Sequence, residues 1–264
     1  MSLVIHRIQE HYQYAKTLYD VDNIIGCFCT GSQNYGTDMP YSDVDTKLLI
    51  TPKLEDIYKD HKAESTTKIM PDASDEHIGV KDIRQAIHEI KKQNINMLEL
   101  LYTDFYILNP AYKDCFERLI SRRDEIVRYN QIAAVKTING NAINSYNRMY
   151  KEDGSINQKQ VANLVRFEYY LDKYIAGSPY IQCLRPDEET VKYIKQIREG
   201  ELGENSLMTI ADASINHISS EVDAFCDRTD IPPANSRIED FLLEVCKDFI
   251  DSSFFMEYAK RGDL

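Results

Sequence analysis

A short polar segment between two apolar runs contains the residue types that bind phosphates and metal ions. It begins with Gly31-Ser32 and ends with Asp43-Val44-Asp45. Because glycine has no side chain, backbone N–H groups beside it can approach a phosphate closely, and the serine hydroxyl can donate a further hydrogen bond. Two carboxylates so close together repel each other unless a cation lies between them. The segment therefore predicts a site for a nucleoside triphosphate and its metal ions.

Two predicted strands position these residues. One strand spans 24–29, before the glycine-serine turn, and the other spans 44–50 and stops at Thr51-Pro52. Side chains alternate along a strand, so Asp43 and Asp45 are expected on one face, with Cα atoms about 6.5–7 Å apart. Carboxylate oxygens suit Mg²⁺ or Mn²⁺, and two such ions about 3.5–4 Å apart would activate an attacking oxygen and stabilise a leaving one. We therefore expect Mg²⁺ or Mn²⁺ as the cofactor.

Two other ligand-binding motifs do not fit this segment. A calcium-binding EF-hand loop that starts at Asp43 would need glycine at its sixth position and glutamate at its twelfth, and these are Leu48 and Leu54. A Walker-type loop needs Gly-Lys-Ser or Gly-Lys-Thr, a tripeptide that does not occur in the sequence. An Asp-x-Asp alone is most often part of a solvated loop. The prediction depends on the combination of strand, Gly-Ser and Asp-x-Asp.

With these residues the segment resembles the nucleotidyltransferase superfamily, which includes DNA polymerase beta, CCA-adding enzymes and aminoglycoside nucleotidyltransferases. It is more similar to the predicted nucleotidyltransferases of bacteria and their phages, in which GS-x-x-Y-G precedes S-D-x-D. The matching residues are Gly31, Ser32, Tyr35, Gly36, Ser42, Asp43 and Asp45. The resemblance implies transfer of a nucleoside monophosphate from an NTP to an acceptor hydroxyl, with release of pyrophosphate. It also implies that both aspartates are catalytic residues and metal ligands.

The resemblance further implies a third carboxylate on a later strand. Residues 76–86 look like the strand that leads into a helix in this superfamily, with Asp82 at the junction. We therefore expect Asp82 to be the third catalytic residue and metal ligand. Since Asp82 ends a strand-like run and precedes a helical pattern, an N-cap of that helix is the competing interpretation. Asp75 and Glu76 are the alternative carboxylates.

Residues 93–101 are similar to another helix of the family. Leu98, Leu101 and Tyr102 have the spacing of a buried helix face. Most of this segment is therefore expected to be structural, and Glu99 is expected on the helix surface or behind the catalytic residues.

A predicted helix at 157–175 contains three basic residues at intervals of seven, Lys159, Arg166 and Lys173. They lie along one side of the helix, about 10.5 Å between neighbours. Alone, such a stripe is most often a solvated face. In the resembling nucleotidyltransferases, however, a helix at this place supplies basic side chains to the triphosphate. The resemblance assigns nucleotide binding to Gly31, Ser32, Tyr35, Lys159 and Arg166.

The order of predicted elements indicates an α/β (α+β) fold. Residues 1–106 mix strand and helix patterns, whereas the pattern from residue 114 onward is almost entirely helical. A chain of 264 residues can bury a substantial core. From the resemblance we expect a nucleotidyltransferase-type mixed β-sheet flanked by helices in a catalytic domain at 1–110. A mainly helical domain at 111–264 would complete the cleft for nucleotide and acceptor.

The charge of the chain limits its partners. With 31 basic and 43 acidic residues, the net charge of −12 opposes non-specific attraction to a polyanion, so general DNA binding is not expected. A small basic cluster offers a place where a specific RNA could dock, although ordinary surface is the commoner role of such clusters. Its members are Arg118, Arg122, Arg123 and Arg128. The expected partners are an NTP and an acceptor that is a small molecule, a protein or an RNA end.

The cysteines and the apolar runs predict a reduced cytoplasmic protein. The six cysteines fit neither a zinc site nor a disulfide framework. The sequence contains no signal-peptide pattern and no run of 18 apolar residues, so no membrane association is expected. Two alternative functions on the same fold stay open: a nucleotide-binding regulatory protein, and a toxin-like or defence-associated protein.

Overall fold

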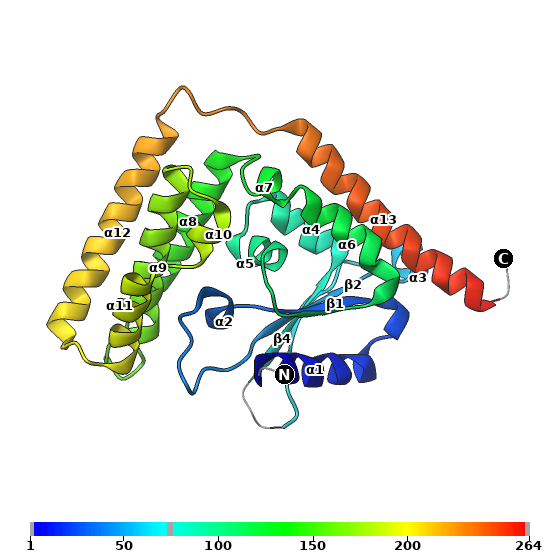
Figure 1. Ribbon diagram of the computed structural model, residues 1–264, viewed down its shortest axis with the longest axis horizontal. Helices are drawn as coiled ribbons and strands as arrows, with labels where there is room; N and C mark the ends of the chain where they lie inside the picture. Colours follow the sequence, from blue (N-terminus) through cyan, green and yellow to red (C-terminus); the bar gives the residue numbers. More distant parts are fainter. Residues whose placement is uncertain (1–2, 73–75, 262–264) are drawn as a thin grey trace. The chain divides into compact units, whose positions relative to one another are not determined.

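The computed structural model describes residues 3–72 and 76–261, and the chain forms two compact units (Figure 1). One unit, here called the sheet unit, comprises residues 1–34, 42–126 and 235–264. The other, called the helical unit, comprises residues 35–41 and 127–234. The mixture of strands and helices confirms the α/β class.

Within the described residues, the sheet unit contains a five-stranded sheet in the order β3-β4-β2-β1-β5. Strands β2 and β4 are parallel, and the other neighbouring pairs are antiparallel. The strands are β1 (Ile24–Cys29), β2 (Thr46–Ile50), β3 (Ser65–Ile69), β4 (His77–Asp82) and β5 (Tyr106–Leu108). The two strands predicted around the glycine-serine turn are confirmed. Because β2 begins at Thr46, the two aspartates lie in the loop before it.

Helices cover both faces of this sheet, and Figure 1 shows α1 on one side and α4, α6 and α13 on the other. Alternate residues of β1, β2 and β4 pack with Ile8 and Ala15 of α1. The opposite face includes Phe28 of β1, whose ring contacts Phe116 of α6 at a centroid distance of 5.2 Å. These helices are α1 (Leu3–Leu18), α4 (Ile83–Lys91), α6 (Lys113–Ser121) and α13 (Ser236–Arg261).

The local sequence explains why these elements form where they do. All six residues of β1 are buried, as expected for a strand covered on both faces. Gly26 is needed in this strand because a Cβ there would lie 2.8 Å from the carbonyl oxygen of Ile107 in β5. In α4 the buried residues recur with helical spacing, which places that face on the core. They are Ile83, Ala86, Ile87 and Ile90.

Short helices connect the longer elements of the sheet unit. Helix α2 contains the boundary between the two units, which falls between Asn34 and Tyr35. The short helices are η1 (Val21–Asn23), α2 (Ser32–Tyr35), α3 (Leu54–Tyr58), α5 (Ile95–Leu98), η2 (Glu99–Leu101), η3 (Pro110–Tyr112) and α7 (Arg123–Ile126).

The helical unit is built around α9, which packs against the four other helices of this unit in the described part of the chain. These elements are α8 (Gln131–Asn147), α9 (Gln158–Ile175), α10 (Tyr180–Leu184), α11 (Glu188–Glu199) and α12 (Glu204–Cys226). The helix predicted at 157–175 is therefore confirmed, and Val161, Leu164 and Val165 are buried on it as expected.

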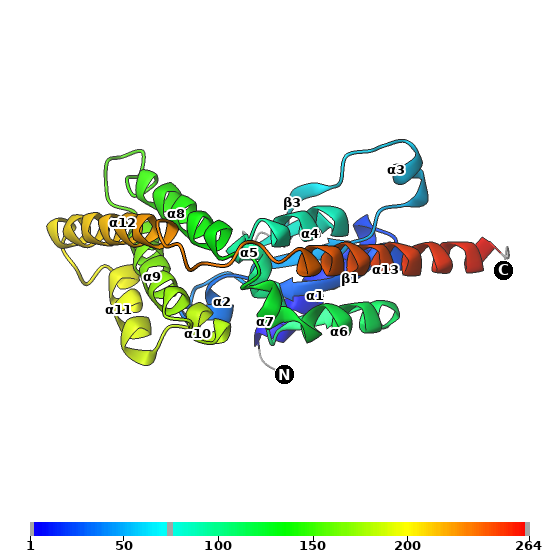
Figure 2. The same ribbon diagram turned by 90° about the horizontal axis from the view of Figure 1, so that it is seen from above.

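The two units differ from the predicted domains 1–110 and 111–264. Residues 111–126 and the last helix belong with the sheet, and residues 35–41 belong with the helical unit. Helix α13 runs along α4 and α6 (Figure 2). Ser253 of α13 accepts hydrogen bonds from Asn23 at 3.0 Å and from Thr51 at 2.8 Å. Phe249 packs against Tyr112, with ring centroids 6.0 Å apart. These long-range contacts cannot be read from a helical pattern.

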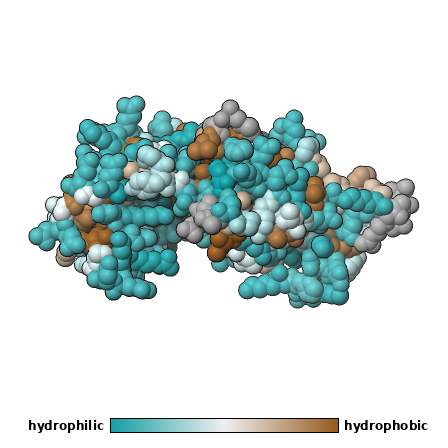
Figure 3. Space-filling view, turned by 90° about the horizontal axis from the view of Figure 1, so that it is seen from below, coloured by the Kyte–Doolittle hydropathy of each residue, from teal (hydrophilic) through white to brown (hydrophobic). Residues whose placement is uncertain are grey.

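The surface in Figure 3 is mostly hydrophilic, with hydrophobic residues in small separate groups. Across residues 3–72 and 76–261, no helix has both the length and the apolar character needed to cross a bilayer.

Phe249→Ala should lower the free energy of unfolding by about 3–5 kcal/mol, because it removes a fully buried ring between α13 and the rest of the sheet unit. Urea denaturation followed by circular dichroism measures this loss. Phe255→Ala, at a position that is 64% exposed on the same helix, is the matched control and should change stability little. Equal effects of the two substitutions would contradict the assignment of α13 to the sheet unit.

Candidate functional site

The aspartate pair lies in the loop that leads into β2. Val44 between them is buried, Asp43 is exposed and Asp45 is half-buried. The alternation continues through buried Thr46 to half-buried Lys47. The loop thus keeps the two-residue periodicity of the strand, and Asp43, Asp45 and Lys47 share one face.

The glycine-serine turn is bonded directly to this loop. The backbone N–H of Thr30, at the end of β1, donates to the carbonyl oxygen of Asp45 at 3.0 Å. Gly31 follows with φ +77°, in the left-handed region that favours glycine, and Ser32 begins α2. The structure therefore places Thr30, the residue immediately before Gly31-Ser32, in contact with Asp45.

A buried carboxylate from another element holds the turn. Glu99 of η2 is only 2% exposed, and its Oε2 accepts a hydrogen bond from the N–H of Gly31 at 3.2 Å. Its Oε1 lies 3.9 Å from Nζ of Lys47. Burial lowers the pKa of Lys47, and the negative charge of Glu99 opposes this effect. Glu99 thus lies behind the turn, and the N–H of Gly31 faces this carboxylate.

Asp82 does not join the aspartate pair, which corrects its expected role as third metal ligand. Because β2 and β4 are parallel, Asp82 pairs with Ile50, at the opposite end of β2 from Asp45. Five residues of strand separate these ends by about 16 Å. The carboxylate of Asp82 caps α4 by accepting from the N–H of Arg84 at 2.8 Å, and also pairs with the guanidinium of Arg84 at 2.6 Å. The competing N-cap interpretation is the correct one.

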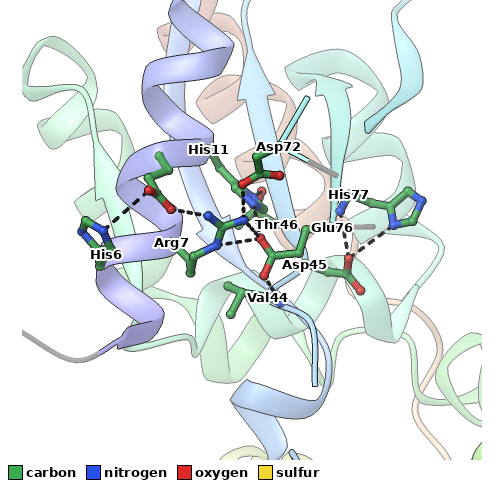
Figure 4. A network of polar contacts seen from close by, with 10 residues as sticks. His6, Arg7, His11, Val44, Asp45, Thr46, Asp72, Glu76 and His77 are labelled. Atoms are coloured by element: carbon green, nitrogen blue, oxygen red, sulfur yellow. Dashed lines mark hydrogen bonds and ion pairs between the residues drawn. The ribbon is translucent and has the colours of Figure 1, made fainter. Parts of the chain in front are cut away.

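His77 lies beside Asp45 at the start of β4. The backbone N–H of His77 donates to Oδ1 of Asp45 at 3.2 Å, and its ring Nδ1 is 3.7 Å from the same oxygen (Figure 4). Both side chains are about half exposed. Asp75, one of the alternative carboxylates, lies outside the described residues. Among the residues that are described, no three His, Cys, Asp or Glu side chains are grouped to hold a metal ion.

Glu76, the other alternative carboxylate, is turned away from the carboxylate of Asp45 toward α1 (Figure 4). Its Oε1 accepts the N–H of Val44 at 3.0 Å. Its Oε2 accepts from Nε of Arg7 at 2.8 Å and lies 3.0 Å from Nε2 of His11. Nδ1 of His11 is in turn 2.9 Å from the hydroxyl of Thr46. This buried network joins α1 to the residues on both sides of Asp45.

The pKa values of both His11 and Glu76 are lowered in this network. Burial lowers the pKa of His11 below 6.5, although the hydrogen bond to Glu76 opposes that change. Burial alone would raise the pKa of Glu76, but the hydrogen bonds from Arg7, Val44 and His11 outweigh it and hold the pKa below 4.5. A carboxylate in this place therefore stays charged at neutral pH.

No protein-family model matches the chain, and no curated protein is significantly similar to it. The resemblance to nucleotidyltransferases thus depends on the motif residues alone.

The helical unit contains a second set of predicted residues. Arg166 is only 7% exposed, and its guanidinium carbon lies 4.2 Å from the ring centroid of Tyr35 and 4.5 Å from that of Phe167. Its Nη1 is buried and has no hydrogen-bond partner within the described residues. Arg166 and Tyr35 are therefore brought together. Lys159 is exposed on the same helix, about 10.5 Å along the axis from Arg166.

The predicted basic cluster is used in internal contacts. Arg118 pairs with Glu244 at 2.7 Å and also with Asp248. Arg122 pairs with Glu125 at 2.6 Å. Arg123 donates to the carbonyl oxygen of Leu101, and Arg128 to those of Tyr174 and Ser178. The cluster is therefore not a set of free basic side chains for RNA.

The free energy of unfolding should fall as the pH is lowered from 6.5, because the unfolded chain protonates His11 more readily than the folded protein does. Glu76 should add to the loss below pH 4.5, for the same reason. In His11→Gln the slope of stability against pH between 6.5 and 4.5 should be smaller than in the wild type. Urea denaturation at a series of pH values measures it, with exposed His61→Gln as the control. An unchanged slope in His11→Gln would show that His11 does not titrate differently on folding.

Proposed function

We propose that this protein is a metal-dependent nucleotidyltransferase, which moves a nucleoside monophosphate from an NTP to an acceptor hydroxyl and releases pyrophosphate. The observation that carries the proposal is the 3.0 Å hydrogen bond from Thr30 N–H to Asp45 O. It joins the Gly31-Ser32 turn to the aspartate pair. A triphosphate bridged by metal ions needs hydrogen-bond donors to its phosphates close to carboxylates that bind the metal.

The aspartate pair has the donor chemistry of a Mg²⁺ or Mn²⁺ site. Asp43 and Asp45 share one face, and neither forms a salt bridge with a lysine or arginine in the described part of the chain. Mg²⁺ is commonly held by one or two carboxylates together with substrate phosphates and water, so two aspartates are sufficient protein ligands. The bound metal would neutralise charge on the phosphates and activate the acceptor oxygen.

The residues around the pair would position the substrate. The hydroxyl of Ser32 is proposed to donate to a phosphate, and Glu99 with Lys47 to hold the turn in place. Most of the rate would come from the alignment of the acceptor oxygen with the α-phosphorus and from stabilisation of charge that develops in the transition state. Since Asp82 lies at the other end of β4, the proposal gives it no role in catalysis.

Arg166 is proposed to bind a phosphate group, the role that the resemblance implies for it. A buried guanidinium nitrogen without a partner is costly, and a phosphate oxygen would supply the missing acceptor in a charge-assisted hydrogen bond. The ring of Tyr35 stacks on the planar guanidinium and restricts its orientation. Lys159 is proposed as a weaker contact, because its side chain is exposed to solvent.

A second candidate, a nucleotide-binding regulatory protein without transfer activity, is favoured by one observation. The residue beside Asp45 on β4 is His77, where the resemblance implies a third carboxylate nearby. Binding of an NTP without pyrophosphate release would support this function over the first.

The proposal is tested by incubation of the protein with each α-labelled NTP, Mg²⁺ or Mn²⁺ and a cell extract. A labelled metabolite, protein or RNA would identify the acceptor class, and a labelled host tRNA or protein would point to a toxin-like or defence role. The absence of both label and pyrophosphate with every NTP would overturn the proposal.

Asp43→Asn and Asp45→Asn should each abolish transfer and leave the fold intact, because each removes a metal ligand and also relieves repulsion between the two carboxylates. Pyrophosphate release measures activity, and thermal unfolding without metal measures the fold. Asp60→Asn, at an exposed position of the same unit, is the control and should retain activity. Normal turnover by both site variants would exclude the assignment.

Arg166→Met should weaken NTP binding about 10- to 100-fold, since a hydrogen bond to a charged group contributes about 1.5–3 kcal/mol. The free energy of unfolding of the free protein should fall by less than the free energy of NTP binding does. The substitution keeps much of the side-chain volume and removes an unpaired buried nitrogen. Isothermal titration with a non-hydrolysable NTP analogue measures the affinity. Lys192→Met, at an exposed position of α11, is the control and should bind like the wild type.

A further inference from the structure

The parallel ladder between β2 and β4 ends just before the aspartate pair is reached. Its described register runs from Ile50 and Asp82 back to Thr46 and Ile78. Two residues further back, the same register sets Val44 opposite Glu76. There the acceptor for the N–H of Val44 is the side chain of Glu76, at 3.0 Å, and not a backbone carbonyl. The carboxylate therefore continues the ladder into the loop.

Three further contacts hold the residues around Asp45. The carbonyl oxygen of Asp45 is bonded to Thr30 and its carboxylate to the N–H of His77. The hydroxyl of Thr46 is bonded to His11. With the Val44 bond, each residue from 44 to 46 has a hydrogen bond to another segment of the sheet unit. Without Glu76, the N–H between the two aspartates would lose its acceptor.

Helix α1 holds Glu76 in turn. Glu76 is 6% exposed, and the guanidinium of Arg7 contacts its Oε2 through two nitrogens. A buried carboxylate is tolerated only where such charges and hydrogen bonds compensate the loss of water. His11 contributes a bond to the same oxygen, so Oε1 is left to accept from Val44.

We propose that Glu76 is a positioning residue for the metal site. Its carboxylate, clamped by Arg7 and His11 of α1, fixes the backbone of Val44, so that Asp43 and Asp45 present their oxygens on the same face. This inference rests on the proposed function, because it gives the two aspartates a metal to bind. Groups that orient metal ligands from behind typically change metal affinity or activity 10- to 100-fold when they are removed.

The test compares Glu76→Ala, Glu76→Gln and Ile8→Ala in the full chain. Ile8 is a fully buried residue of α1 next to Arg7, so its truncation destabilises the same helix and keeps the bond between Glu76 and Val44. The measurements are Mn²⁺ affinity by electron paramagnetic resonance, kcat and the KM for NTP at saturating Mn²⁺, and hydrogen exchange of the Val44 amide.

Glu76→Ala should weaken Mn²⁺ binding about 10- to 100-fold and accelerate exchange of the Val44 amide. Glu76→Gln keeps an oxygen acceptor for Val44, so it should lose less Mn²⁺ affinity than Glu76→Ala. If the alanine variant does not fold, Glu76→Gln alone tests the positioning role. Ile8→Ala should lose stability and keep the Mn²⁺ affinity of the wild type.

The possible negative results distinguish a failure of the positioning role from a failure of the proposed function. If Glu76→Ala binds Mn²⁺ like the wild type while Asp45→Asn does not bind it, the positioning role is overturned and the proposed function stands. If Ile8→Ala loses as much affinity as Glu76→Ala, the effect is one of general stability and the positioning role is likewise overturned. If the wild type binds no more Mn²⁺ than Asp45→Asn, the metal site and the positioning role fall together.

Discussion

Strands β2 and β4 run parallel, so the residues that precede both strands meet at one edge of the sheet and the residues that follow them meet at the opposite edge. This pairing brings His77 to the carboxylate of Asp45 and Glu76 to the amide of Val44. It also removes Asp82 to the far end, where the carboxylate begins α4. The parallel pairing of β2 and β4 thus determines which of these side chains lie near the aspartate pair.

Two buried carboxylates hold the two parts of the motif from opposite faces of the sheet. Glu76 lies on the α1 side and holds the aspartate loop, and Glu99 lies on the side of Lys47 and holds the glycine turn. Each has a cationic partner, Arg7 in one case and Lys47 in the other. Because a buried charge is costly when it loses its partner, these pairs restrict how far either segment can move. Two buried carboxylates thus support the segments that carry the more exposed aspartates.

The sequence predicted what depends on local pattern. The strands predicted at 24–29 and 44–50 and the helix predicted at 157–175 follow from short-range spacing. The structure has these elements at Ile24–Cys29, Thr46–Ile50 and Gln158–Ile175. The partner strand of β2, by contrast, comes later in the chain, and local pattern does not say whether it runs parallel. For that reason the sequence alone could not show that Asp82 lies at the opposite end of β2 from Asp45.

Burial of charged residues was also beyond the local pattern. A spacing of seven residues places Lys159 and Arg166 on the same side of α9. Lys159 is nevertheless exposed and Arg166 buried, because different residues surround the two helical turns. For Glu99 a signal was present, since a single carboxylate within the apolar run from Leu98 to Leu101 is expected to find a partner inside the protein.

The division of the chain has a consequence for its synthesis. The sheet unit is assembled from three separate stretches, and residues 127–234 of the helical unit are inserted before the last of them. As the chain leaves the ribosome, the helices of that insertion can pack together while the sheet still lacks α13. The face of the sheet unit that α13 covers, including Tyr112, is then open to water and to chaperones until the final stretch emerges. Domains interrupted in this way fold through contacts of long sequence separation, which form slowly.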